Sequence, residues 1–295
     1  MFFGAHVSIA KGVENAPLNA AAIGCEVFQM FTRSPQGGPA PKLTPEAIKL
    51  FRARCKENNL HEWVVHTPYY INLANANEAI RKNSAHIIHE ELERASLLSA
   101  KYVMFHPGSA KDVGETKAMG FVTAGIKRVL EGYKGSAQLL IEISAGTGMI
   151  IGDTFEEVAA ILDGVGHPEL GVCFDTAHAF ASGYDLRDED AVNETFKQFD
   201  KTIGLKRLKM SHCNDSKVEL GARRDRHEHI GKGFIGKEGF EAMLHHPKLQ
   251  HLNFYLETEH DDVEEDLKML KKIRGNPPPS PPLSRRGVRS SPDSL

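Results

Sequence analysis

The chain has 295 residues, of which 41% are hydrophobic and 25% are charged, close to the average of globular proteins. This length can bury a substantial core, either as one large domain or as two small ones. The formal net charge of −3 by itself disfavours a nucleic-acid partner, because affinity for phosphates comes from a cationic surface.

Membrane and secreted proteins are also disfavoured. No apolar run approaches the ~18 residues that a membrane span needs, and the N-terminus lacks the basic and apolar pattern of a signal peptide. The four cysteines are scattered without a C-x-x-C pair, which indicates reduced thiols. We therefore expect a cytoplasmic protein with no membrane partner.

Eight short apolar, β-branched or aromatic runs follow one another along the chain and predict strands. They lie near residues 2–6, 25–31, 61–66, 102–106, 138–143, 170–175, 205–212 and 252–258. Helical spacing fills the intervals, as at 47–54, 92–99, 155–162 (with Asp153 and Thr154 as candidate caps) and 263–273. Strands spaced mostly ~30–45 residues apart with helices between them indicate a parallel sheet.

This alternation favours an α/β fold, a single-domain (β/α)₈ barrel over residues 1–274. An open doubly wound sheet is the alternative, but its phosphate-binding fingerprint is missing, since 146–148 is only a bare G-x-G. Residues 275–295 hold six of the fifteen prolines and five serines. Such a segment cannot bury enough apolar surface to offset its ordering entropy, so we expect a disordered tail.

Residues of metal-ligand type stand where six of the predicted strands end: His66, His106, Glu142, Asp175, His212 and Glu257. The carboxyl ends of barrel strands surround one mouth, where barrel active sites are built. A single histidine there is more often a loop residue, and a single aspartate is more often a helix cap. Six converging donors would repel one another or stay poorly solvated without a cation, so together they predict a metal centre.

Two local patterns extend this set. Asp175 and His178 are three residues apart where a strand turns into a helix, so both can face the mouth. Asp225 and His227 have i, i+2 spacing, which points both side chains to one side of an extended segment. Alone this pair would be part of a solvated charged loop, but beside a metal mouth it supplies ligands for a third site. His6 ends the first strand, where it could contact substrate.

Histidine and carboxylate donors without clustered thiolates favour zinc, manganese or iron. Nine candidate ligands exceed the needs of one ion and suit two or three, at roughly three protein ligands per catalytic metal. Glu142 is the central candidate for a carboxylate shared by two ions. Clusters of this kind suit the hydrolysis of phosphate esters.

The sequence resembles the endonuclease IV family (apurinic/apyrimidinic endonuclease family 2) from about Phe3 to Ile273. The matching segments are G-A-H-V-S at 4–8, H-P-G-S at 106–109, D-T-A-H-A-F-A-S-G-Y-D at 175–185, H-C-N-D at 212–215 and D-R-H-E-H-I-G-K-G at 225–233. The resemblance implies a barrel with three zinc ions per chain, with Mn²⁺ possible at some sites. His66, His106 and Glu142 would hold the first ion; Glu142, Asp175, His212 and Glu257 the second; and His178, Asp225 and His227 the third.

The implied reaction is hydrolysis of the phosphodiester 5′ to an abasic site in damaged double-stranded DNA, with Glu142 as the catalytic residue. It would leave a 3′-hydroxyl and a 5′-deoxyribose phosphate, and the same chemistry would clean blocked 3′ ends. Expected DNA-contacting residues are His6, Arg33, Tyr69, Tyr70, Arg224 and Lys232. The resemblance also implies an arginine inserted into DNA from the loop after strand two. Here Gln36 stands in that place, with Arg33 nearby, so we expect selectivity for abasic sites either to rest more on Tyr69 or to be weaker.

Two other functions remain open from the residues. A single-metal sugar isomerase or epimerase would need only Glu142, Asp175, His212 and Glu257, and would leave the other five candidate ligands without a role. A catalytically silent barrel that binds damaged DNA would lack the bridging ligand, which is present as Glu142. Bound divalent ions beside Arg223, Arg224, Arg226 and Lys232 would make the mouth locally cationic despite the net charge. We expect a monomer.

Overall fold

A computed structural model describes residues 1–276 of the chain. Eight parallel strands form a closed barrel in the order β1-β10-β7-β6-β5-β4-β3-β2. The barrel strands are β1 (Phe3–His6), β2 (Val27–Met30), β3 (Glu62–His66), β4 (Tyr102–Phe105), β5 (Gln138–Glu142), β6 (Gly171–Asp175), β7 (Leu208–His212) and β10 (Phe254–Leu256). Each lies inside its predicted run, so the (β/α)₈ prediction is confirmed.

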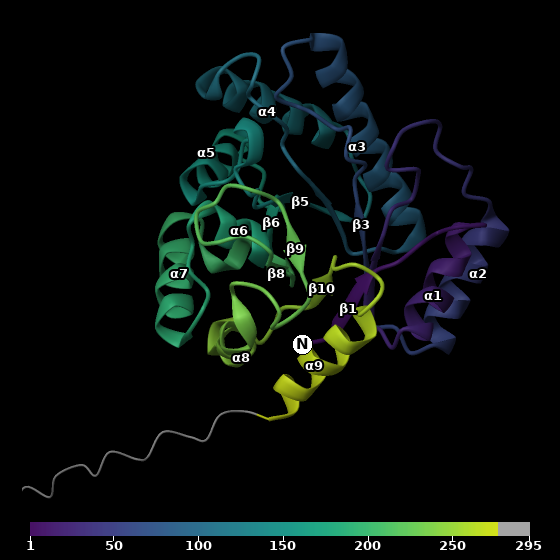
Figure 1. Cartoon of the computed structure of the whole chain (residues 1–295). Coiled ribbons are helices and arrows are strands. Elements are labelled where there is room, and N and C mark those ends of the chain that lie inside the picture. Colours follow the sequence, from purple (N-terminus) through teal and green to yellow (C-terminus); the bar gives the residue numbers. More distant parts are fainter. Residues whose placement is uncertain (277–295) are drawn as a thin grey trace, which may run out of the picture.

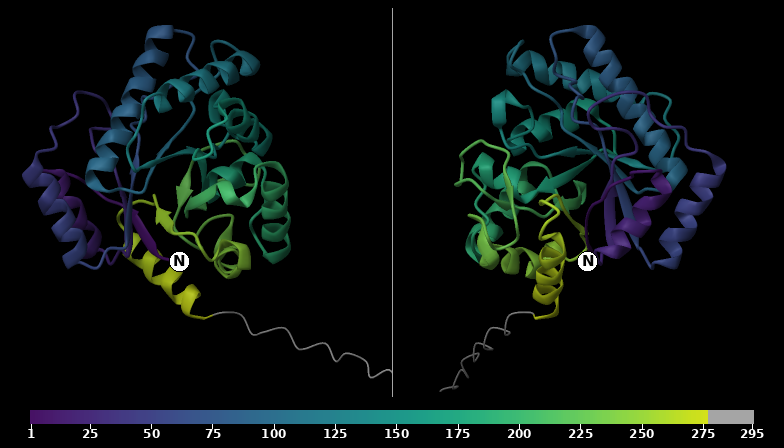
Figure 2. Two further views of the ribbon diagram at one scale, coloured as in Figure 1. Left: turned by 180° about the vertical axis from the view of Figure 1, so that it is seen from behind. Right: turned by 45° about the vertical axis from the view of Figure 1, so that its right-hand side comes forward.

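Helices connect the strands and surround the barrel (Figures 1 and 2). They are α1 (Ala16–Ala22), α2 (Pro45–Glu57), α3 (Glu78–Leu98), α4 (Glu115–Leu130), α5 (Phe155–Val165), α6 (Thr176–Ser182), α7 (Glu189–Thr202), α8 (Gly236–His245) and α9 (Val263–Gly275). β1 pairs with both β2 and β10, which closes the ring, and α9 lies beside the N-terminal strand in both figures. No helix within residues 1–276 is long and apolar enough to cross a membrane.

Local sequence explains where the helices begin. Thr154 caps α5, since its hydroxyl accepts a hydrogen bond from the Glu157 amide at 3.2 Å. Asp153, the other candidate cap, instead forms an ion pair with Arg223. α9 ends at Gly275, one residue beyond the predicted domain end. The predicted disordered tail falls almost entirely outside the described residues.

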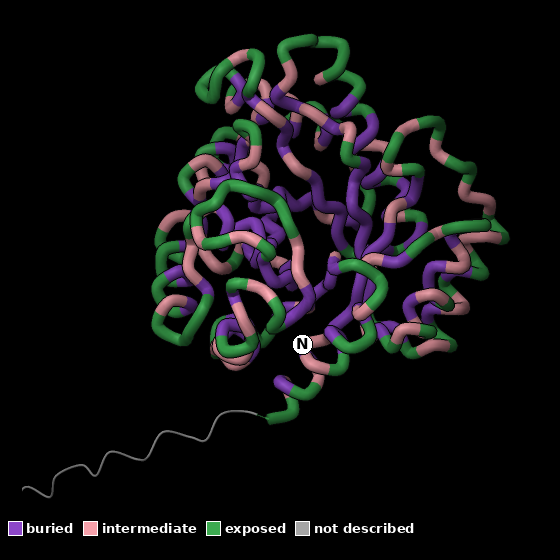
Figure 3. Tube along the Cα trace, viewed as in Figure 1, coloured by how far each residue is buried: buried purple, intermediate pink, exposed green. Residues whose placement is uncertain are grey.

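Burial follows the barrel geometry. The strands at the centre are mostly buried, and exposed residues lie on the outer sides of the helices and on loops (Figure 3). The four cysteines, expected from the sequence to be reduced, are free thiols, and the fold buries all four. One element is absent from the sequence-based assignment: the short antiparallel pair β8 (Asp215–Ser216) and β9 (His227–Glu228), which leaves the barrel after β7.

Candidate metal centre

The pleat of the strands arranges the barrel interior in layers. One inner layer contains Val27, Val64, Met104, Leu140, Cys173, Met210 and Tyr255, one from each of seven strands. Side chains on a strand return to the same face every second residue. Two positions further along each chain segment stand Gln29, His66, His106, Glu142, Asp175, His212 and Glu257. The next layer, at the barrel mouth, therefore consists almost entirely of ionisable side chains.

The first donor group combines His66, His106 and Glu142, whose ligand atoms lie within 4.8 Å of one another. His66 Nε2 is 3.2 Å from Glu142 Oε2, and His106 Nε2 is 3.5 Å from the same oxygen. The other ring nitrogen of His66, Nδ1, lies 2.6 Å from the Thr67 carbonyl, to which it can donate. That bond leaves the Nε2 lone pair of His66 directed at the group's centre.

The second donor group shares Glu142 and adds Asp175, His212 and Glu257. His212 Nδ1 lies 2.9 Å from Glu142 Oε1, 3.3 Å from Glu257 Oε2 and 3.7 Å from Asp175 Oδ2. Glu142, Asp175 and His212 have no solvent-exposed surface. Three carboxylates so close together, two of them fully buried, require positive charge between them.

The third donor group shares Asp175 and adds His178 and His227. Asp225 completes it: its Oδ1 is 3.3 Å from the Nε2 atoms of both histidines. Asp175 also caps α6 by accepting a hydrogen bond from the His178 amide at 2.7 Å, which fixes the first turn of the helix that presents His178. The β8–β9 pair lies next to α6 (Figure 1), and β9 supplies His227 to this group.

Protonated histidines supply the positive charge in the metal-free protein. Burial favours the neutral form of His212, but Cys173, Glu257 and Glu142 beside the ring hold its pKa well above the ordinary value. Burial opposes protonation of His178 as well, yet Asp175 and Asp225 raise its pKa strongly. Burial would raise the pKa of Glu142, but the surrounding imidazoles hold it well below the ordinary range. Divalent cations can take over the charge of these protons, so the donor groups fit metal ions.

Predicted substrate-contacting aromatics lie beside this centre. Tyr69 is 67% exposed, and its ring packs edge-on against Phe31 at 5.4 Å between centroids. The His6 ring packs against the same Phe31 ring, at 4.4 Å between centroids. Tyr70 is half-buried and packs on the hydrophobic core. Tyr69 is thus the aromatic ring most accessible to a ligand among these residues.

Of the cationic residues predicted to contact DNA, two are exposed to solvent and one is buried. Arg224 is exposed on the loop before β9, and Lys232 is exposed with its ammonium 2.6 Å from Asp262. Arg33 is buried, with a side chain only 4% exposed, and its guanidinium donates to Glu91 at 2.5 Å and to Glu90 at 2.7 Å on α3. These bonds hold Arg33 away from the surface that DNA could reach.

Three residues missed by the sequence prediction support the donor groups. The Gln29 amide contacts His212 and Glu257. The Asn214 amide donates to Asp175 at 2.8 Å, and its oxygen accepts from the Glu257 backbone at 2.7 Å. The Thr147 hydroxyl accepts from the Asp225 backbone at 3.0 Å. Strand periodicity could have found Gln29, which stands two residues after an inward valine; the other two depend on loop contacts.

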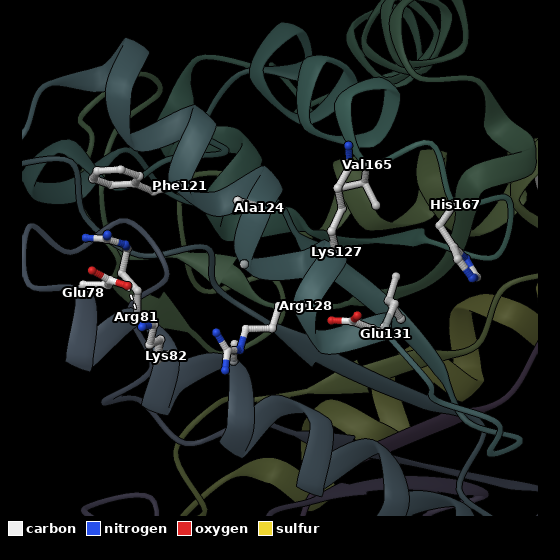
Figure 4. A pocket seen from close by; sticks show the side chains of 13 residues that line it. Glu78, Arg81, Lys82, Phe121, Ala124, Lys127, Arg128, Glu131, Val165 and His167 are labelled. Carbon is white, nitrogen blue, oxygen red and sulfur yellow. Dashed lines mark ion pairs between the residues drawn. The ribbon is translucent and has the colours of Figure 1, made fainter.

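A hollow of about 900 Å³ lies elsewhere, on the outside of the barrel between α3, α4 and the end of α5 (Figure 4). Arg81, Lys82, Lys127 and Arg128 line it together with Glu78 and Glu131. Arg81 lies over the Phe121 ring, and Lys82 pairs with Glu78. None of the nine donor residues lines this hollow, so it is separate from the metal centre.

Comparison with known proteins identifies the class first. The model of the xylose isomerase-like TIM barrel family matches residues 17–273. A D-tagatose 3-epimerase-like protein of known structure, 21% identical, superposes with a TM-score of 0.70 over 93% of this chain and 98% of its own, which shows the shared fold. Fold and donor groups together define a metal-dependent enzyme of these barrels.

Relatives with higher sequence identity show which family within these barrels the chain belongs to. A probable endonuclease 4 of Chloroflexus aggregans is 38% identical over 92% of this chain and 96% of its own length. The crystal structure of endonuclease IV from Thermus thermophilus is 34% identical and superposes with a TM-score of 0.82, covering 93% of this chain and 98% of that one. The chain belongs to the endonuclease IV family and is a metal-dependent nuclease.

Proposed function

We propose that this enzyme is a three-zinc DNA repair endonuclease. It hydrolyses the phosphodiester 5′ to abasic sites in duplex DNA, leaving a 3′-hydroxyl and a 5′-deoxyribose phosphate, and it removes 3′-blocking groups at the same centre. One observation carries the proposal: three donor groups meet at one barrel mouth and are joined by two shared carboxylates, Glu142 and Asp175.

The donor chemistry supports zinc. The eight residues of the three donor groups, with Asp225 beside the third, supply only imidazole nitrogens and carboxylate oxygens, and each group offers the three or four protein donors typical of zinc sites. Mn²⁺ suits the same donors and could occupy some of the sites. When bound, the ions would activate water and offset the charge of the phosphate and of the leaving oxygen.

The protein side chains divide the remaining tasks. Glu142 would join the first and second sites through its two oxygens, which face different histidines: Oε2 faces His66, and Oε1 faces His212. Asp175 would join the second site to the third. Tyr69 offers a ring for stacking on a base or on the exposed edge of a lesion, and Arg224 offers an unburied cation for backbone phosphates.

A sugar isomerase or epimerase uses the same fold with one ion. The second donor group alone would serve it, and the first and third groups would have no function. A protein that only binds damaged DNA would not need the buried carboxylate at Glu142, whose position is unfavourable without cations. Both alternatives therefore explain less of the site.

A single experiment tests the proposal. The metal-loaded enzyme is incubated with a duplex oligonucleotide that carries one abasic-site analogue, with and without a chelator, and metal per chain is measured on the same preparation. We expect incision immediately 5′ to the analogue, loss of incision with chelator, and about three ions per chain. No incision together with about one ion per chain and epimerisation of a ketose would overturn the proposal in favour of the isomerase.

A further inference from the structure

Gln29 stands in the mouth layer at the place where the neighbouring strands carry ionisable donors. It lies on β2, is fully buried, and points its amide at the second donor group. Its Nε2 lies 2.6 Å from Glu257 Oε1, and its Oε1 lies 2.7 Å from His212 Nε2. A third contact joins Nε2 to His6 Nδ1 at 3.0 Å.

The three contacts permit one arrangement of hydrogens. A carboxylate can only accept, so the NH₂ end of the Gln29 amide must face Glu257. The same NH₂ has a second hydrogen, which His6 Nδ1 accepts. The carbonyl end then faces His212 Nε2, and that nitrogen must carry a hydrogen to be satisfied.

This arrangement selects one form of the His212 ring. With the hydrogen on Nε2, a neutral His212 keeps its lone pair on Nδ1, the atom that lies 2.9 Å from Glu142 and 3.3 Å from Glu257. The opposite tautomer carries its hydrogen on Nδ1, at the centre of the second group. Its Nε2 lone pair would then face the lone pairs of Gln29 Oε1, which is repulsive. The amide thereby disfavours the neutral tautomer of His212 that has no lone pair on Nδ1.

We infer that Gln29 is a positioning residue: it keeps the hydrogen on His212 Nε2, so that Nδ1 is the nitrogen that gives up its proton and binds the second ion, and it fixes one oxygen of Glu257. The inference rests on the proposed metal function and names a residue that supports it without being a ligand. An amide suits this role because it donates to the carboxylate and accepts from the imidazole, whereas an ionised carboxylate can only accept and a lysine or arginine can only donate.

The test compares Gln29→Met with the parent. Methionine has nearly the same length and fills the space, but it removes all three hydrogen bonds of the amide. A matched control is Gln138→Met, since Gln138 begins β5 at the other end of the barrel and its amide donates only to the Glu169 carbonyl. Zinc affinity is measured by competition with a chelator of known affinity, and the cobalt-substituted proteins are compared by their visible absorption.

We expect Gln29→Met to bind one of its ions about 10–100-fold more weakly, the effect typical of losing an orienting hydrogen bond to a metal ligand. The cobalt absorption of that site should change, while Gln138→Met matches the parent in both measurements. A Gln29→Asn variant, whose shorter amide cannot reach both partners, should give a smaller loss of affinity. If the methionine variant does not fold, the zinc affinity of Gln29→Asn tests the role of Gln29 instead.

Unfolding of the metal-free proteins separates positioning from simple packing. A lower melting temperature of the metal-free Gln29→Met protein with unchanged zinc affinity would overturn the inference, as would unchanged affinity in the asparagine variant. The outcome is independent of the proposed reaction. A parent that binds its ions but does not incise abasic DNA would refute the proposed function, whereas the affinity comparison would still decide the role of Gln29.

Discussion

Replacing Glu142 by glutamine is the sharpest perturbation of the proposed centre, because this carboxylate belongs to two donor groups. Glutamine keeps the shape of the side chain and removes its charge. A unit charge and a divalent ion ~4 Å apart interact by about 8 kcal/mol at an effective dielectric constant of about 20. Glutamine also avoids the desolvation cost of a buried carboxylate, which we take to offset about half of the lost attraction. The variant then loses about 4 kcal/mol of binding free energy per ion.

This loss corresponds to about a thousandfold weaker binding of an ion or a comparable fall in rate, since 1.36 kcal/mol equals a factor of ten. We therefore expect Glu142→Gln to lose strand incision on the abasic duplex and to retain its circular dichroism spectrum. Metal per chain, measured after dialysis, should fall by one or two ions. Incision at the parental rate would refute the assignment of Glu142 and the reasoning that connects the first two groups.

Glu91→Gln is the matched control for this experiment. Glu91 is another fully buried carboxylate, but it accepts from Thr32 and Arg33 and lies outside the donor groups. Removing its charge leaves a buried guanidinium without its full partner, which costs stability by up to ~3 kcal/mol. This variant should melt at a lower temperature and keep its metal content. Loss of metal from both variants would show that any buried charge change disrupts the mouth.

Three further predictions concern metal removal, pH and substrate contact. Adding a chelator should lower the melting temperature, because an ion at 1,000 times its Kd stabilises the fold by about 4 kcal/mol per site; an unchanged melting curve would speak against resident ions. Burial raises the pKa of Glu157 to about 7, from 4.5, and nearby Asp153 adds to the shift. The folded state therefore binds this proton more tightly, and its stabilising contribution is present below about pH 4.5 and is lost as pH rises through about 7. Glu157 is only half-buried, so solvent screening leaves about 1 kcal/mol of this effect. Glu157→Gln should therefore raise the melting temperature by about 2–4 °C at pH 8 and not at pH 4.5; an equal change at both values would contradict the shift. Tyr69→Ala should weaken the binding of an abasic duplex about tenfold or more, because the stacking ring is lost, whereas Tyr69→Phe should bind like the parent. Both are measured by fluorescence anisotropy titration. Binding by Tyr69→Ala as tight as that of Tyr69→Phe would remove Tyr69 from the proposed surface.

Much of the fold could be predicted because its signals are local. Apolar runs at regular intervals identified the eight barrel strands, since each strand is short and buried on both faces. Thr154 was a recognisable cap because its partner, the Glu157 amide, is three residues away. The β8–β9 pair escaped prediction, because two-residue strands carry no periodicity and are held by a partner 11–13 residues distant.

The candidate site likewise has residues that could be predicted from local sequence and residues that could not. Strand ends were predictable as a set, because the carboxyl ends of parallel barrel strands must meet. The burial of Arg33 could not be predicted, because the local sequence of a loop does not show whether its arginine faces solvent or a distant partner. Here the partner is Glu91, which lies on a helix 58 residues later in the chain. The roles of Asn214 and Thr147 likewise depend on contacts between loops that are far apart in sequence.

The sequence by itself determined the barrel and the residues of its mouth, because strand spacing and the two-residue period are properties of the local chain. Only the tertiary structure decided how those residues are grouped: which carboxylates are shared, which histidine nitrogen faces the centre, and that the Gln29 amide spans His212 and Glu257. These facts depend on distances between strands and on the direction of single hydrogen bonds. Such distances arise only when the barrel closes, so no pattern along the chain contains them.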